Sequence, residues 1–366
     1  MNAELVVDLE RFRANLAALR AYAPDALQLA VVKANAYGHG MVPMARAARE
    51  VADWLGVATP DEALALRSAG DRGPLLCWLG TPGAPYPALV AAGVDLTASG
   101  VDQLDEIAAA GERPCVHLKV DTGLSRNGAL GPQWDDLVAH AARLQAAGRI
   151  EVAGVWSHFA CADEPGHPAN DQQEQAFRAA VDQLADAGVQ PYLRHLANSA
   201  ATVTRPSSHF DLVRVGIAAY GLPPDAAVPV PGVVPVLTAR ARLAHVKRVP
   251  AGTSVSYGWR WTADHETTLG LVPVGYGEGI HRAASGRAAV GHSGQRAPVR
   301  GTICMDQFVV DLGDRPARIG DVVTLFGAGH DGEPTAMDWA AAAGTIGYEV
   351  VTGLTGRWVR TYRGAR

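Results

Sequence analysis

The sequence predicts an α/β protein, with an N-terminal (β/α)8 TIM barrel followed by a mainly β C-terminal domain. Two observations support this fold class. Through roughly the first 220 residues, short apolar runs alternate with longer alanine-rich segments whose apolar residues recur at helical spacing. After Gly221 the pattern changes to a stretch rich in Pro and Val, and then to strands and turns.

The first part contains eight apolar runs that have the length of buried strands. Eight strands with intervening helices are the count of a (β/α)8 barrel. An open, doubly wound sheet is the competing architecture, but no GxGxxG motif follows the first run. The strands are expected at residues 27–32, 54–58, 74–79, 94–97, 114–120, 152–158, 192–196 and 212–215. The helices are expected at residues 43–51, 60–69, 101–110, 134–147 and 170–187, and several of them end at glycine.

The domain boundaries follow from the change in composition. We expect the barrel domain in residues 1–225, a linker in 226–236 and the C-terminal β domain in 237–366. An opening strand, 4–8, and a helix, 9–21, precede the eight runs. In the second domain the strands are expected at 239–248, 268–274, 297–303, 308–312 and 322–326, with one helix at 336–343.

Composition excludes several classes of partner. The apolar fraction of 48% and the mean hydropathy of +0.03 are those of an ordinary globular protein. The formal charge of -5 predicts neither nucleic acid nor an anionic membrane surface as partner. We expect a cytoplasmic protein, because the chain start lacks the pattern of a signal peptide. We expect no membrane span, because no apolar run approaches the roughly 18 residues that one needs. The four cysteines are dispersed and the histidines form no metal-binding motif, so no metal is expected.

Lys33 is the first candidate for chemistry. It ends an apolar strand and precedes a glycine-rich turn that contains Tyr37 and His39. A lysine at the end of a buried strand is costly to desolvate unless its amine reacts or finds a partner. An amine with a lowered pKa can form a Schiff base with an aldehyde cofactor. A solvated strand end is the alternative interpretation of the pattern.

Polar residues also occur at the ends of other predicted strands, where a barrel gathers its catalytic groups. Arg214 lies in an apolar strand, so its guanidinium needs a partner, and an ion pair with Asp211 is one alternative. The loops after the seventh and eighth strands are a frequent phosphate site in barrels. The further residues at these positions are Lys119, Arg126, His158, Asn198 and Ser199.

Several strings in the chain resemble segments of the bacterial alanine racemases. The ten residues from Val31 to Gly40, VVKANAYGHG, resemble the family segment whose lysine carries pyridoxal phosphate. The other strings are HLKVDTGLSR from His117, ANSA from Ala197, LVRVGI from Leu212, SVSYG from Ser254, GYGEG from Gly275, CMDQ from Cys304 and IGYEV from Ile346. These strings extend over nearly the whole chain. The resemblance also implies that the opening strand, 4–8, joins the C-terminal β domain.

The resemblance implies a pyridoxal 5'-phosphate cofactor on Lys33. Arg214 would then face the pyridine nitrogen, and because a guanidinium does not readily give up a proton, that nitrogen would stay unprotonated. The resemblance implies that Arg126 contacts the phenolic oxygen and the substrate carboxylate. It also implies that the phosphate and the rest of the cofactor are held by Tyr37, His158, Asn198, Ser199, Gly216, Ile217 and Tyr348.

Lys119 corresponds to a family lysine that can be carbamylated and then positions Arg126. Carbamylation would replace a cation by an anion, which makes its pairing with a guanidinium favourable. A bridge between Lys119 and Asp121 or another carboxylate is the alternative.

The resemblance implies that Tyr257 is the second acid–base group and that it comes from the other subunit of a homodimer. Racemisation needs proton removal on one face of the α-carbon and delivery on the other, and two bases meet that need. The substrate would be alanine, contacted by Arg126, Met305, Asp306 and Tyr276. The implied function is the interconversion of L- and D-alanine, which supplies D-alanine for peptidoglycan.

The chain departs from the family pattern at two places. The family more often has Ala-Asp where this chain has Gly277-Glu278, and threonine where it has Cys161.

Two other hypotheses remain at this stage. A basic amino-acid decarboxylase shares the two-domain plan and uses a cysteine of its β domain, for which Cys304 is a candidate. A protein that only binds and delivers pyridoxal phosphate would resemble the barrel alone.

Overall fold

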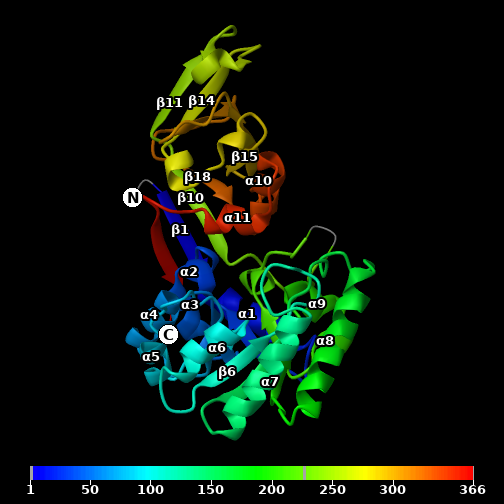
Figure 1. The fold of residues 1–366 in the computed structure, drawn as a ribbon. Coiled ribbons are helices and arrows are strands. Elements are labelled where there is room, and N and C mark those ends of the chain that lie inside the picture. Colours follow the sequence, from blue (N-terminus) through cyan, green and yellow to red (C-terminus); the bar gives the residue numbers. More distant parts are fainter. Residues whose placement is uncertain (1–2, 226–227, 366) are drawn as a thin grey trace.

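The computed structural model describes residues 3–225 and 228–365 of the 366-residue chain. Residues 1–2, 226–227 and 366 lie outside the described part and include the first two positions of the expected linker. The chain forms a barrel with a β-rich part stacked on one end of it (Figure 1). Among the described helices, none combines the length and the apolar composition that crossing a membrane requires.

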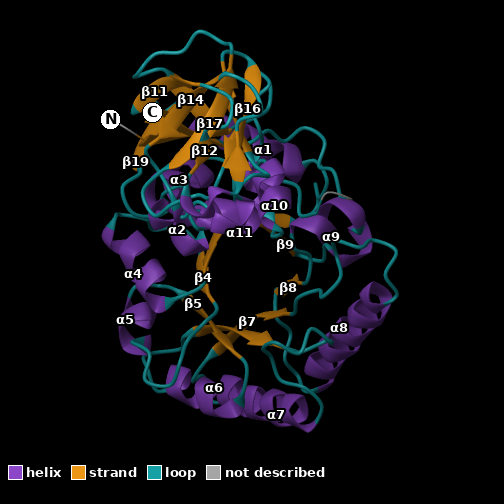
Figure 2. Cartoon of the chain, turned by 90° about the horizontal axis from the view of Figure 1, so that it is seen from above, coloured by secondary structure: helices purple, strands orange, loops and turns teal. Residues whose placement is uncertain are grey.

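The barrel is an eight-stranded parallel sheet with the order β8-β7-β6-β5-β4-β3-β2-β9. Its helices lie on the outside of the ring (Figure 2). Backbone hydrogen bonds of 3.0 Å, from Asp211 to Arg194 and from Arg214 to Ala197, close the gap between β8 and β9. The prediction of a (β/α)8 barrel is therefore confirmed, and the open sheet is not observed. The strands are β2 (Leu27–Val31), β3 (Trp54–Val57), β4 (Leu75–Cys77), β5 (Asp95–Ala98), β6 (Cys115–Lys119), β7 (Glu151–Trp156), β8 (Leu193–His195) and β9 (Leu212–Val215).

The outer helices begin where the sequence offers capping groups. At the start of α4, Thr59 and Glu62 form a capping box, in which each side chain accepts a backbone N–H of the other residue. The two six-residue helices α5 and α9 were not predicted, because so few residues give no helical periodicity. The helices are α1 (Leu9–Arg20), α3 (Met41–Arg49), α4 (Pro60–Ser68), α5 (Tyr86–Ala91), α6 (Val101–Ala108), α7 (Pro132–Ala146), α8 (Ala169–Asp186) and α9 (Ser199–Thr204).

The β-rich part is built on a nine-stranded sheet with the order β11-β14-β17-β16-β15-β18-β10-β1-β19. The opening strand β1 pairs with β10 and with β19, so the first and last segments of the chain lie side by side in this sheet. The strands are β1 (Ala3–Asp8), β10 (Leu237–Arg242), β11 (His245–Val249), β14 (Thr267–Val272), β15 (Ala289–His292), β16 (Gln295–Arg300), β17 (Phe308–Gly313), β18 (Val322–Phe326) and β19 (Val359–Arg363), and β12 (Ser254–Val255) and β13 (Trp261–Thr262) form a separate pair.

Two expectations for this part were wrong in detail. The segment 239–248 is not one strand, because the chain turns at Leu243 and Ala244, whose amides bond to Asp321 and Leu271 respectively. Its two halves, β10 and β11, then pair with different strands. The single expected helix, α10 (Ala336–Ala343), is followed by a second, α11 (Gly347–Thr352), which lies at the rim of the barrel opening in Figure 2.

Two glycines let the β-rich part approach the Lys33 loop closely. A Cβ atom on Gly38 would lie 2.1 Å from the carbonyl oxygen of Val351, and one on Gly40 would lie 1.9 Å from the hydroxyl of Tyr362. Both glycines have positive φ angles, of +82° and +105°. The Arg360 guanidinium also donates to the Gly38 carbonyl at 2.8 Å. The loop that carries Lys33 is therefore clamped from the β-rich part.

Gly154 on β7 makes room for a histidine inside the barrel. The His117 ring is fully buried, and a Cβ on Gly154 would lie 2.3 Å from its Nδ1. Hydrogen bonds at both ring nitrogens, to His195 and to Asp95, prevent the ring from moving aside. Only glycine at this position leaves room for the ring as it stands.

We therefore expect Gly154→Ala to lower the free energy of unfolding by about 1–3 kcal/mol, the usual cost of overpacking a core. Urea denaturation followed by circular dichroism measures this change. Gly166→Ala is the matched control, because a Cβ there meets no atom within 4 Å. Equal stability of the two variants would show that the barrel interior yields at this point.

Candidate active site

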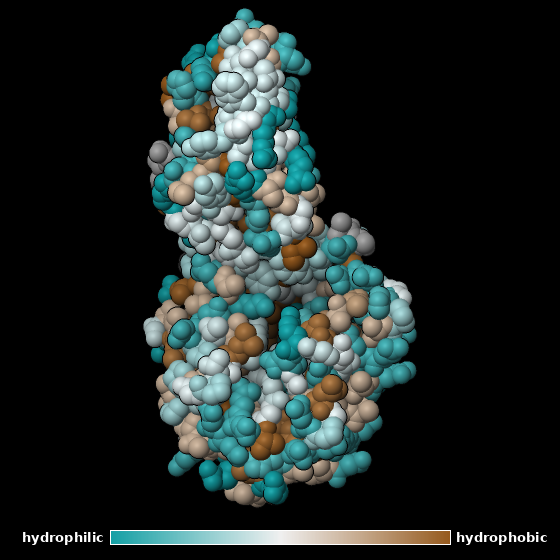
Figure 3. All heavy atoms as spheres, turned by 45° about the horizontal axis from the view of Figure 1, so that its top comes forward, coloured by the Kyte–Doolittle hydropathy of each residue, from teal (hydrophilic) through white to brown (hydrophobic). Residues whose placement is uncertain are grey.

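A cavity of about 720 Å³ opens at the carboxyl ends of the barrel strands, beneath α11. In the surface view a depression lies where the barrel meets the β-rich part (Figure 3). Residues of six barrel strands or the loops after them, together with two residues of α11, line it. The predicted site residues among them are Lys33, Tyr37, Lys119, Arg126, His158, Asn198, Ser199, Arg214, Gly216, Ile217 and Tyr348.

Lys33 follows β2 and begins a strained turn. The next four residues, Ala34 to Tyr37, have φ angles of 51–53° and form a left-handed helical turn. Such a conformation costs roughly 1–2 kcal/mol per non-glycine residue. Strain of this kind persists where the surroundings enforce it and is concentrated at functional sites.

The electrostatic environment favours the neutral form of the Lys33 amine. Burial lowers the pKa of this amine below its ordinary value, and the charges of Arg126 and Arg214 lower it further. The nitrogen lies 5.7 Å from the ring centre of Trp78. A neutral, nucleophilic amine is what covalent attachment of an aldehyde requires.

Several hydrogen-bond donors that have no acceptor among the described residues meet at one end of the cavity. The Ser199 hydroxyl oxygen accepts the Gly216 amide at 2.9 Å, which leaves the hydroxyl hydrogen free to donate. Ile217 opens the short 3-10 helix η2 (Ile217–Tyr220), so its amide has no acceptor within the helix. The rings of Tyr37 and Tyr348 are 6.3 Å apart, and burial raises the pKa of both hydroxyls, which therefore remain donors. Such a set of donors suits a phosphate group.

The terminal nitrogens of Arg214 are held in place by neighbouring groups. Nη2 donates to the carbonyls of Ser157 at 2.8 Å and Leu196 at 3.1 Å, and lies 3.2 Å from Nδ1 of His158. Among the described residues, Nε–H has no acceptor, so it is available to a group in the cavity. The alternative interpretation, an ion pair between Arg214 and Asp211, is not observed, because Asp211 pairs with Arg194 at 2.7 Å.

The protonation states of Arg214 and His158 follow from their burial and from nearby charges. Burial and the charge of Arg126 lower the pKa of Arg214 to about 9, so the guanidinium still carries its charge at pH 7. Burial and the same guanidinium groups hold the pKa of His158 well below its ordinary value. His158 is therefore neutral, and because its Nδ1 accepts from Arg214, its proton lies on Nε2.

Lys119 and Arg126 lie in the same cavity without carboxylate partners. Lys119 forms no ion pair within the described part of the chain, and the oxygen of Asp121 instead accepts the amides of Gly123 and Ser125. The alternative interpretation, a bridge between Lys119 and Asp121, is thus not observed. Burial, Arg214 and Arg126 lower the pKa of Lys119 to about 8. The Arg126 guanidinium makes no hydrogen bond or ion pair with a described residue, so it can receive an anionic ligand.

Two tryptophans that line the cavity were not predicted from the sequence. Trp78 follows β4 and Trp156 ends β7, and their ring centres lie 6.2 Å apart. Lys119 lies 4.2 Å from the ring centre of Trp156. Their positions at or just beyond the ends of barrel strands are the signal that would have indicated them.

A second cluster lies away from this cavity, in the β-rich part. Tyr257, Tyr276, Met305 and Asp306 line a cleft of about 620 Å³. The Tyr257 side chain is 74% exposed and that of Met305 is 55% exposed. The structure therefore gathers the predicted residues into two groups, and none of this second group lines the cavity around Lys33.

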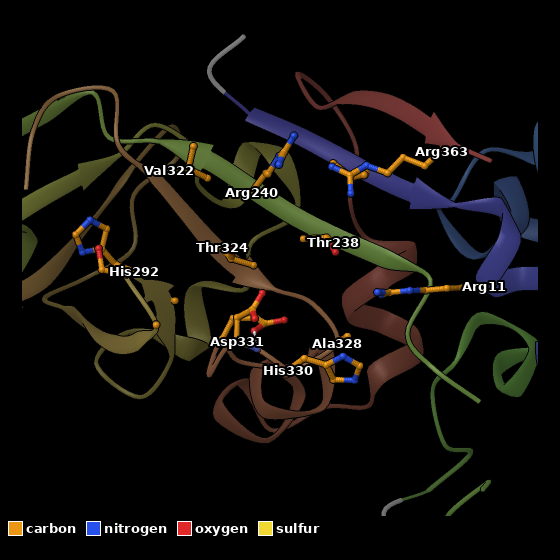
Figure 4. Close-up of a pocket in the computed structure, with 15 residues that line it drawn as sticks. Arg11, Thr238, Arg240, His292, Val322, Thr324, Ala328, His330, Asp331 and Arg363 are labelled. Carbon is orange, nitrogen blue, oxygen red and sulfur yellow. Dashed lines mark hydrogen bonds between the residues drawn. The ribbon is translucent and has the colours of Figure 1, made fainter. Parts of the chain in front are cut away.

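A third cavity, of about 430 Å³, lies over strands β1, β10 and β18 (Figure 4). Two of its three arginines have carboxylate partners, since Arg240 pairs with Glu4 at 2.7 Å and Arg11 with Asp8 at 3.4 Å. None of the predicted site residues lines it. Within the described residues, no cluster of three or more His, Cys, Asp or Glu side chains could hold a metal ion.

Comparison with known families agrees with the two-part structure. The model described as "Alanine racemase, N-terminal domain" matches residues 7–224, and "Alanine racemase, C-terminal domain" matches residues 236–362. The chain belongs to the alanine racemase family.

Relatives within this family match the chain over its whole length. The alanine racemase of Salinispora arenicola is 53% identical over 371 residues, which cover 100% of this chain and 99% of the relative. The crystal structure of alanine racemase from D-cycloserine-producing Streptomyces lavendulae is 51% identical, with a TM-score of 0.97 over 100% of this chain and 97% of that one. The alanine racemase of Bacillus anthracis with bound L-Ala-P is 34% identical, with a TM-score of 0.90 over 100% and 96% of the two chains.

The match to the C-terminal model argues against a carrier made of the barrel alone, and both models favour a racemase over a decarboxylase.

The structure also explains one departure from the alanine racemase pattern. The buried Glu278 carboxylate accepts the Gly275 amide at 2.8 Å and pairs with Arg357, which also pairs with Asp306. Glu278 thus links the segment of Tyr276 to the segment of Met305. Nothing in the structure explains the cysteine at position 161.

Proposed function

We propose that this protein is a pyridoxal-phosphate-dependent alanine racemase that uses Lys33 and Tyr257 as its two bases. The observation that carries the proposal is the cavity around Lys33. It combines an amine of lowered pKa with two arginines and a group of unpaired hydroxyl and amide donors. Membership of the alanine racemase family supports the reaction and the substrate.

The residues present fit pyridoxal phosphate. Ser199, Ile217 and the two tyrosines Tyr37 and Tyr348 would hold the phosphate, and Nε–H of Arg214 would meet the ring nitrogen. Lys33 would hold the aldehyde carbon. When bound, the cofactor supplies the electron sink that makes an α-proton removable. Arg214 limits that sink, because its guanidinium donates a hydrogen bond but keeps its proton.

The two bases act from opposite faces of the substrate. The Lys33 amine takes or returns the α-proton on the D side, and the Tyr257 hydroxyl does so on the L side, as the family resemblance implies. Arg126, which has no partner among the described residues, holds the substrate carboxylate. The proton on Nε2 of His158 can stabilise a tyrosine that loses its proton, so His158 links Arg214 to the second base.

The second base would come from another copy of the chain. Tyr257 and the neighbouring Trp259 expose 74% and 75% of their side chains in one cleft, an unusual exposure for aromatic residues in a protein that acts alone. The cavity around Lys33 has no tyrosine of this cluster. A homodimer that inserts Tyr257 of one subunit into the cavity of the other satisfies both observations.

We expect Lys119 to carry a carbamate. Its pKa of about 8 makes a substantial fraction of the amine neutral near pH 8, and only the neutral amine reacts with carbon dioxide. The product is an anion that feels the charges of Arg126 and Arg214, so carbamylation replaces cationic repulsion by attraction. Protein incubated with ¹³C-labelled bicarbonate should show a carbamate carbon signal by NMR, and the signal should grow as the pH rises through about 8. Its persistence in Lys119→Ala would assign the carbamate to another amine.

Circular dichroism of L-alanine tests the function directly. With cofactor-loaded protein we expect the signal to decay to zero while alanine is still present. A flat signal would direct attention to another amino acid, such as serine, and release of carbon dioxide would support a decarboxylase. The proposal also includes supply of D-alanine for peptidoglycan, which rests on the family resemblance alone, and the cytoplasmic location expected from the sequence.

A further inference from the structure

A continuous chain of buried polar groups runs through the barrel interior and ends at Arg214. Nη1 of Arg214 lies 3.2 Å from Nδ1 of His195, and Nε2 of His195 lies 2.9 Å from Nδ1 of His117. Nε2 of His117 then lies 3.2 Å from Oδ2 of Asp95. Asp95 is the first residue of β5, so the chain extends from the amino end of the barrel toward the carboxyl end, where the cavity lies.

This hydrogen-bonded chain of side chains admits a single arrangement of protons when the rings of His117 and His195 are both neutral. A guanidinium only donates, so Nδ1 of His195 must be an unprotonated acceptor. The proton of a neutral His195 is then on Nε2, where it is donated to Nδ1 of His117. The proton of His117 is in turn on its Nε2 and is donated to the carboxylate of Asp95. Each hydrogen bond thus fixes the direction of the next.

The surroundings hold the chain rigidly. Both histidine rings are fully buried, and Trp156 stacks on His195 with ring centres 5.6 Å apart and an angle of 6°. Trp54 meets His117 edge-on at 5.9 Å, and the missing Cβ of Gly154 gives this ring its space. Burial, His117 and Arg214 hold the pKa of His195 well below its ordinary value, which keeps the ring neutral.

Stability alone does not account for such an interior. Barrels usually fill this space with layers of branched aliphatic side chains. Buried polar groups gain little net stability even when fully hydrogen-bonded, and each is costly if its partner is lost. A chain of three such residues that ends at one guanidinium is therefore better explained by its effect on that guanidinium.

We propose that Asp95, His117 and His195 are positioning residues for Arg214, which hold its Nη1 arm so that Nε–H is presented to the cavity. The carbonyls of Ser157 and Leu196 hold the other arm. Neither arm can then turn without breaking a hydrogen bond to a rigid neighbour. The proposal rests on the proposed role of Arg214 toward the ring nitrogen of the cofactor.

The first test does not depend on activity. ¹⁵N NMR of histidine-labelled, cofactor-loaded protein at pH 7 reports which ring nitrogen of each histidine carries a proton, and His117→Asn and His195→Asn assign the signals. We expect neutral rings protonated at Nε2 for both His117 and His195. A doubly protonated ring, or a proton on Nδ1 of either, would overturn the proposal. Because this measurement is made on the protein itself, it remains valid if the racemase activity is absent.

The second test removes the acceptor of Arg214. We expect His195→Leu to lower kcat for alanine about tenfold, as for the loss of one oriented hydrogen bond worth about 1.4 kcal/mol, with KM changed less than about twofold. The visible absorbance of bound cofactor should also shift in His195→Leu. His140→Leu is the matched control, because His140 forms a similar pair with Asp105, at 2.6 Å, outside the barrel.

Asp95→Asn covers the case in which His195→Leu does not fold, since it keeps the shape of the side chain and removes only its charge. We expect it to shift the ¹⁵N signals of His117 and His195 while both rings stay protonated at Nε2, because Arg214 still only donates to His195, and to lower kcat in the same direction. If kcat and the absorbance were unchanged in folded His195→Leu and Asp95→Asn, the hydrogen-bonded chain from Asp95 to Arg214 would serve stability only.

Discussion

Replacing Lys33 with alanine is expected to abolish the visible absorption band of protein-bound pyridoxal phosphate and to lower racemase activity at least about a thousandfold. The loss is large because one amine would serve two roles, covalent attachment and proton transfer. An absorbance spectrum of the variant after incubation with the cofactor and dialysis measures the first effect. The decay of the dichroism of L-alanine measures the second.

The small number of lysines makes this test unusually clear. The chain has three, Lys33, Lys119 and Lys247. Lys119 lines the same cavity, whereas Lys247 lies exposed on β11 of the β-rich part. Lys247→Ala should therefore leave the band intact. Borohydride reduction should fix the cofactor to the peptide that contains Lys33, and fixation to Lys119 in the wild-type protein would contradict the assignment.

The barrel could be predicted because its local signals agree with its global fold. The eight apolar runs correspond to β2 through β9, and β9 matches the expected residues 212–215 without a shift. Apolar run length is a reliable signal here because parallel strands are buried on both faces. Part of the site followed from the same rule, since polar residues at the carboxyl ends of barrel strands face a common cavity. Tyr348, which lies on α11, was expected only from the family resemblance.

The features of the fold and the site that could not be predicted depend on contacts between distant segments of the chain. The pairing of β1 with β19 joins the two ends of the chain, and no local pattern encodes such a contact. The left-handed turn after Lys33 opposes the intrinsic preference of Ala34 and Ala36 and is imposed by the surrounding fold. The interior chain from Asp95 to Arg214 uses residues of four strands that look unremarkable one at a time.

Replacing Tyr257 with phenylalanine is expected to slow removal of the α-proton from L-alanine at least about a hundredfold, the usual contribution of a positioned acid–base group. Exchange of the α-proton of D-alanine should be far less affected, because Lys33 serves that side. Loss of deuterium from each α-deuterated enantiomer, measured separately in water, gives the two rates. Tyr192→Phe is the control, since that tyrosine is exposed just before β8. Equal slowing for both enantiomers would exclude a two-base division between these residues.

A mixture of the Lys33→Ala and Tyr257→Phe proteins then tests whether the two bases come from different subunits. In a homodimer with shared sites, half of the randomly formed dimers are hybrids. Each hybrid has one site with both bases intact and one with neither, so co-refolded protein should recover about a quarter of the wild-type activity. If both bases came from one chain, every site would lack one of them and no activity would return. The exposure of Tyr257 and the absence of its cluster from the cavity around Lys33 favour recovery.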